Sequence, residues 1–376
     1  MSTPITIRGK RFLVVGLGTS GLAAARLLVE QGARVCVNDL RSEAELGARA
    51  ADVRALGAEL VTSGHPVELF TAVDHIVVSP GVPPLDALTA AERAGVPISS
   101  EIELASWFVT GRIVGITGTN GKSTVTTLIG QMCERAGLHT FVGGNLGRPL
   151  VEVVGTPAAG PDGVVVVELS SFQLERVTHL RSHIALLLNV TDDHLDRYAS
   201  FAAYTAAKAR IFERQGAGDF AILPAGDALC FSAFEAQHTE AGARFFGRAA
   251  SNTKGGVGVV DGAIVDSVSG LTLPTADLKI RGGHNVDNAC AAALAARLLG
   301  IDAAVIAAVL REFPGLSHRM QHVVESRGVT FYDDSKATNV GAAVAALDGL
   351  SELDATGGRV VVIVGGRDKG GSYAPL

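Results

Sequence analysis

One segment, Arg112–Thr124, constrains the fold of this chain more than any other; it reads RIVGITGTNGKST. A β-branched apolar run breaks into a Gly/Thr/Asn turn, the turn closes on Gly-Lys-Ser-Thr, and a helical pattern, Val125–Arg135, follows directly. A strand, a glycine loop and a helix in this order form a phosphate cradle, because loop N–H groups and the helix N-terminus face the anion. Lys122 would supply a point charge for the β/γ-phosphates, and Ser123 a hydroxyl for Mg²⁺.

The loop departs from the strict spacing G-x-x-x-x-G-K-[ST], because Ile116 stands where the first glycine is required. Gly115 and Gly118 lie on either side of that position. The sequence therefore indicates a phosphate loop of a variant type. The alternative is an ordinary strand-to-helix turn that carries a surface lysine.

Apolar runs alternate with helical patterns along the whole chain, which predicts mainly parallel sheets. A length of 376 residues suits two or three domains. We predict an α/β protein of three Rossmann-like or P-loop-type domains, covering residues 1–109, 110–314 and 315–376, with the third incomplete. Within the third we expect Gly358–Val364 to follow a helix as a further apolar strand.

Composition and charge exclude several classes of protein. The net charge is −6 and no Lys/Arg cluster resembles a nucleic-acid face. The apolar runs are far shorter than the roughly 20 residues of a membrane span, and Met1–Val15 lacks the features of a signal peptide. The four cysteines are scattered, which fits a reducing compartment and argues against structural zinc. We expect a cytoplasmic monomer without a membrane or nucleic-acid partner.

A second glycine loop near the N-terminus reads G-L-G-T-S-G and matches G-x-G-x-x-G at Gly16, Gly18 and Gly21. Asp39 follows about twenty residues on, as in a dinucleotide-binding fingerprint. Asp39 could hold ribose hydroxyls or a base edge, and its neighbour Arg41 suggests a phosphate-bearing ligand instead of plain NAD. The alternative is a tight turn whose glycines serve packing; an NAD oxidoreductase rests on this loop alone.

Polar residues end two of the buried-strand patterns of the central region. Glu168 follows four valines and is either a Mg²⁺ ligand beside Ser123 or a solvent-facing residue at a strand end. Thr191–Arg197 is dense in carboxylates; these or His194 could bind metal, or the run is a solvated loop with an aspartate at a helix cap. Lys208, on a helix, reads as a surface lysine when taken alone.

Two strings mark the third unit, FPGLSHR (Phe313–Arg319) and YDDSKATN (Tyr332–Asn339). Arg319 would suit a terminal phosphate, because a guanidinium is always charged and can bind in a bidentate manner. Asp334 and Lys336 lie beside a strand end, where a parallel sheet places its binding crevice. The following helix would point its positive end at the same place.

Together these residues resemble the Mur ligases of peptidoglycan synthesis, over the whole chain. The GTNGKST loop is shared by the wider group of Mur ligases and folylpolyglutamate synthetases. The branch that adds D-glutamate is suggested by VVGLGTSG (Val14–Gly21), ELSSFQLE (Glu168–Glu175), VTDDHLDRY (Val190–Tyr198) and DDSKATN (Asp333–Asn339). The family's third domain continues beyond GGRDKGG, so the resemblance implies a truncated C-terminal domain.

The resemblance implies a chemistry. ATP phosphorylates the carboxylate of UDP-N-acetylmuramoyl-L-alanine, and the amine of D-glutamate attacks the acyl phosphate. Two anions must be brought together, so Mg²⁺ at two sites, Lys122 and the helix end would offset their repulsion. The alternatives are another ligase of the same group, acting on a different amino acid or on folate, and a truncated form that binds nucleotides without turnover.

The resemblance also assigns roles by position. Catalytic roles fall on Lys122, His194, Lys208, His318 and Lys336. ATP contacts fall on Gly118, Thr119, Asn120, Gly121, Lys122, Ser123, Thr124, Asn288, Arg319 and Asp334. The UDP-substrate would contact Thr19, Asp39, Arg41, Ser79, Gly81, Asn145 and Ser170, and D-glutamate would contact Thr338 and Lys369. Metal ligands would be Ser123, Glu168, His194 and Lys208, the last carbamylated by CO₂. Leu40 departs from the family, which has a hydroxyl residue there.

Overall fold

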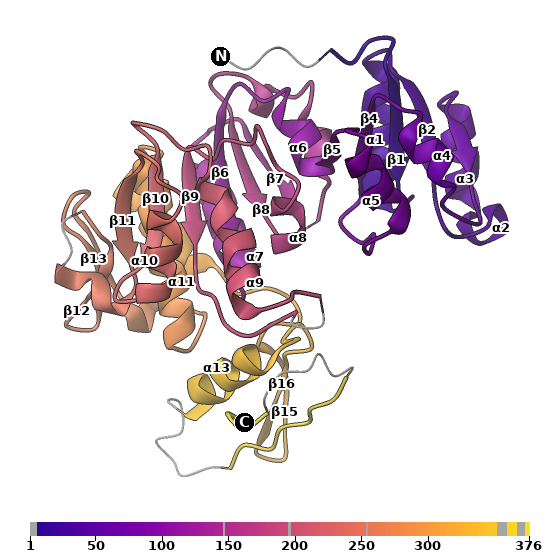
Figure 1. Ribbon diagram of the computed structural model, residues 1–376. Helices are drawn as coiled ribbons and strands as arrows, with labels where there is room; N and C mark the ends of the chain where they lie inside the picture. The colour runs from indigo at the N-terminus through magenta and orange to yellow at the C-terminus, as the bar shows by residue number, and fades with distance from the viewer. Residues whose placement is uncertain (1–5, 146, 195–196, 253–254, 352–358, 367–372) are drawn as a thin grey trace.

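The computed structural model describes residues 6–145, 147–194, 197–252, 255–351, 359–366 and 373–376. Two parallel sheets follow one another along the chain, and a smaller unit with an antiparallel strand pair lies below the second sheet in Figure 1. This α/β architecture with mainly parallel sheets agrees with the prediction.

The first sheet has the order β3-β2-β1-β4-β5 and all of its pairs are parallel. Its strands are β1 (Arg11–Val15), β2 (Arg34–Asn38), β3 (Glu59–Val61), β4 (His75–Val78) and β5 (Ile98–Ser100). Its helices are α1 (Thr19–Glu30), α2 (Glu43–Leu46), α3 (Ala48–Ala55), α4 (Val67–Thr71) and α5 (Asp86–Arg93). Beyond an exposed arginine at the start of each, β1 and β2 are buried and mainly apolar, because helices cover both faces of the sheet.

The second sheet is also parallel, in the order β11-β10-β9-β6-β8-β7. Its strands are β6 (Arg112–Thr117), β7 (Thr140–Gly144), β8 (Val164–Glu168), β9 (Ile184–Leu187), β10 (Phe220–Pro224) and β11 (Gly242–Phe246). Its α-helices are α7 (Lys122–Arg135), α8 (Ser171–Leu174), α9 (Phe201–Ala209), α10 (Ala228–Glu235), α11 (Gly283–Leu298) and α12 (Ala303–Glu312). Short 3₁₀ helices are η1 (Leu150–Val153), η2 (Pro157–Ala159), η3 (Arg210–Phe212), η4 (Arg248–Asn252) and η5 (Thr275–Asp277). Strand β6 lies inside the sheet, so the loop that follows it opens between the ends of β8 and β9.

The Gly-rich stretch ahead of α11 is more regular than its composition suggests. It forms an antiparallel sheet of β12 (Gly258–Val260), β13 (Ala263–Asp266) and β14 (Leu271–Pro274). Asp261 and Gly262 join β12 to β13, and both have positive φ. Asp-Gly is a strong signal for a two-residue hairpin turn of this kind.

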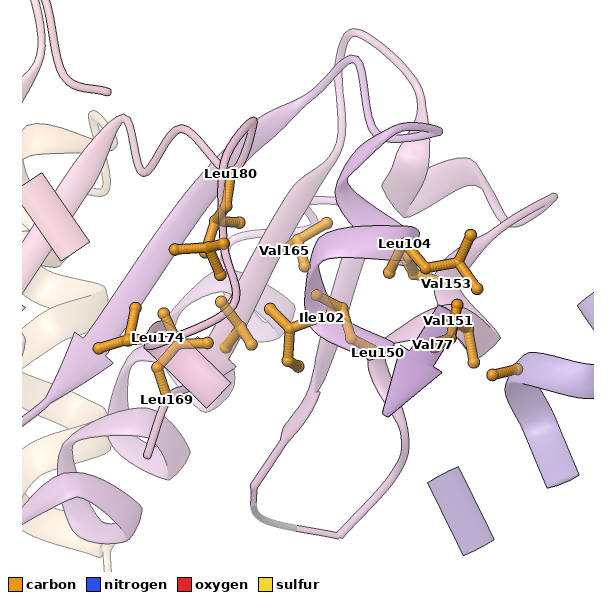
Figure 2. Close-up of a cluster of buried hydrophobic side chains, with 14 of the residues drawn as sticks. Val77, Ile102, Leu104, Leu150, Val151, Val153, Val165, Leu169, Leu174 and Leu180 are labelled. Atoms are coloured by element: carbon orange, nitrogen blue, oxygen red, sulfur yellow. The ribbon is translucent and has the colours of Figure 1, made fainter. Parts of the chain in front are cut away.

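A short helix, α6 (Glu101–Ser106), connects the two parallel sheets and packs against β4 and β5 of the first sheet and against η1. Figure 2 shows Ile102 and Leu104 of this helix among apolar side chains of η1, such as Leu150 and Val153. One continuous core cluster reaches from the first sheet through these residues into the second sheet. The two sheets therefore share a continuous apolar core at this junction.

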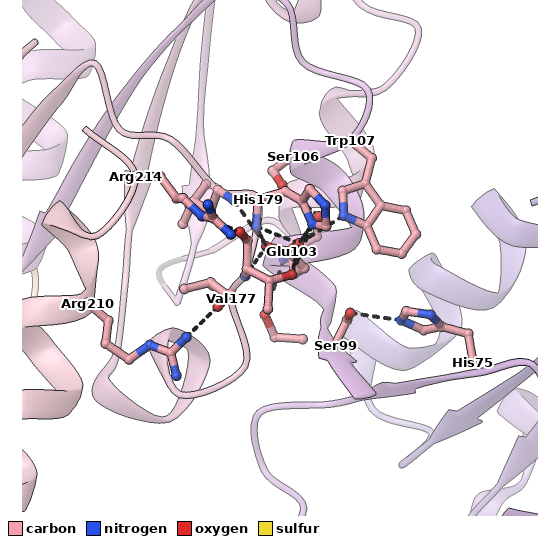
Figure 3. A network of polar contacts seen from close by, with 12 residues as sticks. His75, Ser99, Glu103, Ser106, Trp107, Val177, His179, Arg210 and Arg214 are labelled. Atoms are coloured by element: carbon pink, nitrogen blue, oxygen red, sulfur yellow. Dashed lines mark hydrogen bonds and ion pairs between the residues drawn. The ribbon is translucent and has the colours of Figure 1, made fainter. Parts of the chain in front are cut away.

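Glu103 of α6 is fully buried at the same junction (Figure 3). Its carboxylate accepts hydrogen bonds from the backbone N–H groups of Thr178, His179 and Leu180, at 2.9 to 3.1 Å, and from the indole of Trp107 at 3.0 Å. Burial alone would raise the pKa of Glu103, but the hydrogen bonds from Trp107, Thr178 and His179 outweigh it and lower that pKa. The carboxylate thus fastens α6 to a loop of the second sheet.

The unit after residue 314 contains an antiparallel pair, β15 (Gln321–Ser326) and β16 (Val329–Asp333), and one helix, α13 (Val340–Ser351). The expectation of a strand over Gly358–Val364 is wrong for its described part, since residues 359–366 belong to no strand. Val361 and Ile363 are 87% and 97% exposed. A strand needs a partner for its backbone groups, and no described strand pairs with this run.

Candidate active site

The phosphate loop lies between the end of β6 and the start of α7, as the sequence predicted. Gly118 and Gly121 have positive φ, and a Cβ at Gly121 would lie 2.4 Å from Asn288 Oδ1, so this position requires glycine. The first turn of α7 has no side-chain cap, which leaves its N–H groups available to an anion. Lys122 Nζ donates to the carbonyls of Gly118 and Thr119, each at 2.9 Å.

The segment that follows β9 holds the loop from the other side. Asn189 accepts from the Asn120 N–H at 2.8 Å and donates to the Asn120 carbonyl at 3.1 Å. Thr119 Oγ1 lies between the backbone carbonyl and N–H of Thr191, at 3.2 and 3.0 Å. The sequence placed Asn189 among the polar residues that end this strand pattern, but gave it no role; the structure shows that it holds the loop at Asn120.

Glu168 is buried at the end of β8, beside the loop. One carboxylate oxygen accepts from the Asn145 side chain at 2.7 Å, and the other has no hydrogen-bond partner among the described residues. A buried carboxylate oxygen left without a donor fits a cation ligand. No three His, Cys, Asp or Glu side chains gather into a metal cluster in the part of the chain that the structure describes; the expected ligand set also uses Ser123 and Lys208.

Its helix position alone suggested that Lys208 is a surface residue, but the structure shows that it is buried. It is only 2% exposed, its Nζ donates to the Gly118 carbonyl at 2.8 Å, and it lies 4.6 Å from the centre of the Tyr204 ring. Burial, followed by the charge of Lys122, lowers the pKa of Lys208 well below its ordinary value. Two lysine amines therefore meet at one loop carbonyl.

His194 lies beside this cluster, at the end of the described part of the loop after β9. It adopts positive φ, and its ring lies 4.9 Å from the Phe172 ring and 6.2 Å from the Tyr204 ring. Its Nε2 lies 3.7 Å from a carboxylate oxygen of Asp193. The structure thus brings His194 and Lys208 to the same aromatic side chain, Tyr204.

A cavity of about 520 Å³ opens next to the phosphate loop. Six of the residues expected to contact ATP line it: Asn120, Gly121, Thr124, Asn288, Arg319 and Asp334. The other four expected contacts, Gly118, Thr119, Lys122 and Ser123, belong to the adjoining loop and first turn of α7. Burial raises the pKa of Asp334, whose carboxylate accepts from the Met320 N–H at 3.0 Å.

The third unit meets the phosphate loop through polar side chains. Arg319 donates to Ser123 Oγ at 3.1 Å. Asn339 exchanges hydrogen bonds with the side chain of Asn120, at 3.1 and 3.4 Å, and donates to Asp193 at 3.2 Å. Asn339 had been noted only as part of a motif, so its bridging position is new.

The remaining residues expected in this unit stand apart from the cavity. The His318 ring contacts Asp333 at 2.6 Å, and the backbone of His318 accepts from the Lys336 N–H at 3.1 Å. Lys336 and Thr338 are exposed and do not line the cavity. Lys369 lies outside the described residues.

The first glycine loop forms a second group of expected residues, at the start of α1. Thr19 and Gly81 are exposed, whereas the buried Ser79 donates its hydroxyl to the Gly16 carbonyl at 2.7 Å. Asp39 and Arg41 form an ion pair with a 2.9 Å separation.

A smaller cavity, of about 210 Å³, lies between the two sheets. Ser79 lines it from the first sheet, and Phe172, Arg197 and Tyr198 line it from the second. Ser170 does not line this cavity; it caps α8, exchanging hydrogen bonds with Gln173. The exposed Asn145 is held by Glu168, as described above.

Comparisons with known proteins point to the same family in each part of the chain. Three family profiles match: "Mur ligase MurD-like, N-terminal domain" over residues 10–100, "Mur ligase middle domain" over 116–296, and "Mur ligase, glutamate ligase domain" over 318–376. None of the described helices is long and apolar enough to cross a membrane.

Curated relatives match over nearly the whole chain. A UDP-N-acetylmuramoylalanine–D-glutamate ligase of Geobacter metallireducens is 45% identical, covering 98% of this chain and 80% of that protein. Its namesake in Pelotomaculum thermopropionicum is 42% identical, covering 97% and 78%. The chain therefore spans about four fifths of the length of these relatives.

Solved structures share the fold at lower identity. A murein peptide ligase from Psychrobacter arcticus aligns with a TM-score of 0.56 at 19% identity, covering 93% of this chain and 77% of that one. A MurF ligase from Thermotoga maritima, solved in complex with ADP, aligns with a TM-score of 0.51 at 15% identity, covering 92% and 72%.

Proposed function

The chain belongs to the Mur ligase family, and from this premise we propose that it is an ATP-dependent ligase that joins D-glutamate to UDP-N-acetylmuramoyl-L-alanine. The observation that carries the proposal is the meeting of Lys122, Lys208 and Arg319 around one phosphate loop beside a nucleotide-sized cavity. The acceptor is supported by the relatives' names and by the match of the glutamate ligase profile. We also propose a cytoplasmic monomer, with domains at residues 1–109, 110–314 and 315–376.

The chemistry needs a carboxylate made electrophilic. Transfer of the γ-phosphoryl of ATP gives the carboxylate of the alanyl substrate a phosphate leaving group; the amine of D-glutamate then forms the amide bond and phosphate departs. The residues of the loop would bind and orient the nucleotide: the N–H groups of α7 and the amine of Lys122 would face the β/γ-phosphates, and Arg319 would contact the terminal phosphate. Asn288 and Asp334 would hold adenine and ribose from the cavity wall.

Mg²⁺ fits the residues beside the loop. Ser123 and Glu168 would hold one ion, since Glu168 keeps an oxygen without a protein donor; His194 and carbamylated Lys208 would serve a second. When bound, these ions would neutralise phosphate charge as the two anionic substrates approach. The protein's own part is to hold Lys208 on the loop carbonyl of Gly118 and to keep Glu168 buried at the end of β8.

Lys208 is suited to carbamylation by its burial. The carbamate forms when an uncharged amine attacks CO₂ and loses a proton, and Lys208 is held in a buried site beside Lys122 that disfavours the ammonium form. The product is an anion, which would relieve the repulsion between two neighbouring amines. His318, Lys336, Thr338 and Lys369 are proposed for D-glutamate, as the family pattern indicates.

Lys122→Ala tests the phosphate loop. We expect phosphate release in the presence of both substrates to fall by about 10³-fold or more, with binding of the UDP-substrate within twofold of the parent. The exposed Lys10, paired with Asp74 just before β1 and β4 of the first sheet, provides the control variant Lys10→Ala. Unchanged turnover in Lys122→Ala would remove the phosphate-loop assignment.

The acceptor is tested separately, by phosphate release with D-glutamate, L-alanine, meso-diaminopimelate or L-glutamate. Stimulation by an amino acid other than D-glutamate would overturn the acceptor. Lys208→Ala should be inactive and partly rescued by small carboxylic acids, which can stand in for the carbamate. An inactive variant that no such acid restores would contradict the carbamate role.

A further inference from the structure

The phosphate loop is tied to the segment after β9 by a regular set of backbone contacts. The Leu188 N–H donates to the Thr117 carbonyl, and the Thr119 N–H donates to the Asn189 carbonyl, each at 3.0 Å. A Cβ at Gly118 would lie 3.0 Å from Leu188 Cβ and 3.3 Å from the backbone N and O of Asn189. The pairing of β6 with β9 therefore continues past the last residue of each strand.

At Asn120 a side chain continues this pairing. Asn189 Oδ1 accepts from the Asn120 N–H at 2.8 Å, and Asn189 Nδ2 donates to the Asn120 carbonyl at 3.1 Å. The side-chain amide thus offers this residue the donor and the acceptor that a neighbouring strand would offer. Both contacts require the same orientation of the amide, because an N–H must face an oxygen and a carbonyl must face the NH₂ group.

The N–H groups of the loop consequently fall into two sets. Those of Thr119 and Asn120 donate to Asn189 and are not available to an anion. The next four, of Gly121 to Thr124, lie at the start of α7, where N–H groups have no acceptor within the helix, and no described side chain caps them. The anion-binding part of the loop therefore begins at Gly121, and Asn120 is its anchored end.

A second side-chain amide shows what a purely structural role looks like in the same sheet. Gln215 is buried, and its Nε2 donates to the carbonyls of Ser182 and Phe220 at 2.8 and 2.9 Å. Ser182 precedes β9 and Phe220 begins β10, at the end of the sheet opposite to the phosphate loop. Gln215 and Asn189 both tie backbone groups together, but only Asn189 contacts the phosphate loop.

We propose that Asn189 is a positioning residue of the phosphate loop: by holding the peptide groups of Asn120, it orients the N–H groups of Gly121 to Thr124 toward the phosphates of the nucleotide. The inference rests on the proposed function, since it requires ATP at this loop. It assigns to Asn189 a role that the resemblance did not give it. It also changes the part of the Asn120 backbone from contact with ATP to support of the loop.

Calorimetric binding of ADP and of adenosine tests this role, because the two differ only in the diphosphate. In Asn189→Ala we expect the Kd for ADP to rise about tenfold, since two hydrogen bonds that hold the loop are lost, and the Kd for adenosine to stay within twofold. Asn189→Asp keeps the shape of the side chain but sets an oxygen against the Asn120 carbonyl, so it should bind ADP no better than Asn189→Ala. Gln215→Ala is the matched control, which should lower the free energy of unfolding and leave both Kd values within twofold.

Amide hydrogen exchange measures the two sets of N–H groups directly. In the nucleotide-free parent the N–H groups of Thr119 and Asn120 should be protected, and those of Gly121 to Thr124 should become protected only when ADP is added. Asn189→Ala should speed exchange at Asn120 about tenfold or more and leave the exchange of β10 unchanged. Protection of Asn120 that appears only with ADP would show that its N–H faces the nucleotide and would overturn the division of the loop.

The outcomes for Asn189 separate the inference from the proposed function. If Asn189→Ala binds ADP as the parent does, or loses ADP and adenosine equally, the positioning role of Asn189 is wrong while the ligase assignment stands. If the parent protein itself binds no ADP, the proposed function fails at its ATP site.

Discussion

The two junctions between the parts of this chain differ in the kind of contact that forms them. Between the first and second sheets, apolar side chains of α6 and η1 form one continuous core, and two buried carboxylates add hydrogen bonds to backbone N–H groups. Between the second sheet and the unit after residue 314, the contacts at the phosphate loop are polar: Arg319 to Ser123, and Asn339 to Asn120 and Asp193.

This difference separates a structural junction from a ligand-responsive one. Burial of apolar surface stabilises the first junction whether or not a nucleotide is bound. The second junction uses the groups that ATP and Mg²⁺ would need, since Arg319 donates to the same Ser123 hydroxyl that is proposed as a metal ligand. We therefore expect ligand binding to replace those contacts, so that the third unit moves while the first sheet stays fixed to the second.

The largest expected loss of stability comes from a substitution in the junction between the first and second sheets. Glu103→Ala would leave the N–H groups of Thr178, His179 and Leu180 without their buried acceptor, which should lower the free energy of unfolding by about 3–5 kcal/mol. Urea titration followed by circular dichroism measures it. Glu92→Ala, which removes an exposed partner of Arg176 near the same junction, is the control and should cost under about 1 kcal/mol.

The next effect concerns pH at the same junction. Burial, partly offset by N–H groups of Val151 and Leu150, raises the pKa of Glu101 from 4.5 to about 7. A carboxyl with a raised pKa in the folded state favours folding only while protonated, so its contribution is lost as the pH rises from 4.5 to about 7. The amide in Glu101→Gln stays neutral at every pH, so this variant does not lose that contribution.

Unfolding titrations at several pH values measure this contribution. The stability of Glu101→Gln relative to the parent should increase by up to about 3 kcal/mol between pH 4.5 and pH 8. A stability difference that does not vary with pH would show that Glu101 is ionised at no cost in the folded protein.

The third prediction concerns the ligand-responsive junction. Arg319→Ala should lower kcat about 10²-fold, equivalent to about 2.7 kcal/mol, because it removes the guanidinium that we propose for the terminal phosphate. The free energy of unfolding should change by less than about 0.5 kcal/mol, since one polar contact carries little stability. A large loss of stability with unchanged turnover would reverse the roles of the two junctions.

The smallest effect is expected at the surface of the structural junction. Arg176 donates to Glu92 across the two sheets at 3.0 Å, with Glu92 exposed. Arg176→Ala should lower the free energy of unfolding by less than about 1 kcal/mol. A loss comparable with that of Glu103→Ala would mean that the first junction depends on its exposed charges as well as on its core.

The sequence predicted the features that depend on local chemistry. The phosphate loop follows from its glycines and from the strand and helix around it, and Glu168 follows from a carboxylate after a run of valines. Both are fixed by residues close together in the chain, which is why short patterns predict them.

The features that local patterns did not predict depend on distant partners. In the sequence, Glu103 looks like an ordinary residue in the first turn of a helix that Ser100 caps. In the structure, its carboxylate accepts hydrogen bonds from N–H groups 75 to 77 positions away. Lys208 looked like a surface lysine, and only its contact with Gly118, 90 positions away, shows that it is buried. Asn189 ends a strand pattern, but its hydrogen bonds with Asn120, 69 positions away, depend on the neighbouring positions of β6 and β9.

Helix α6 also determines where the middle of this protein can be cut out or exchanged. A fragment that begins at Arg112 would expose the apolar side chains of η1, such as Leu150 and Val151, to water. A fragment that begins at Ser100 keeps them covered by Ile102 and Leu104 and retains Glu103 for the loop at Thr178. Chimeric proteins that swap the first sheet for that of a relative should therefore be joined before Ser100, so that α6 travels with the catalytic half.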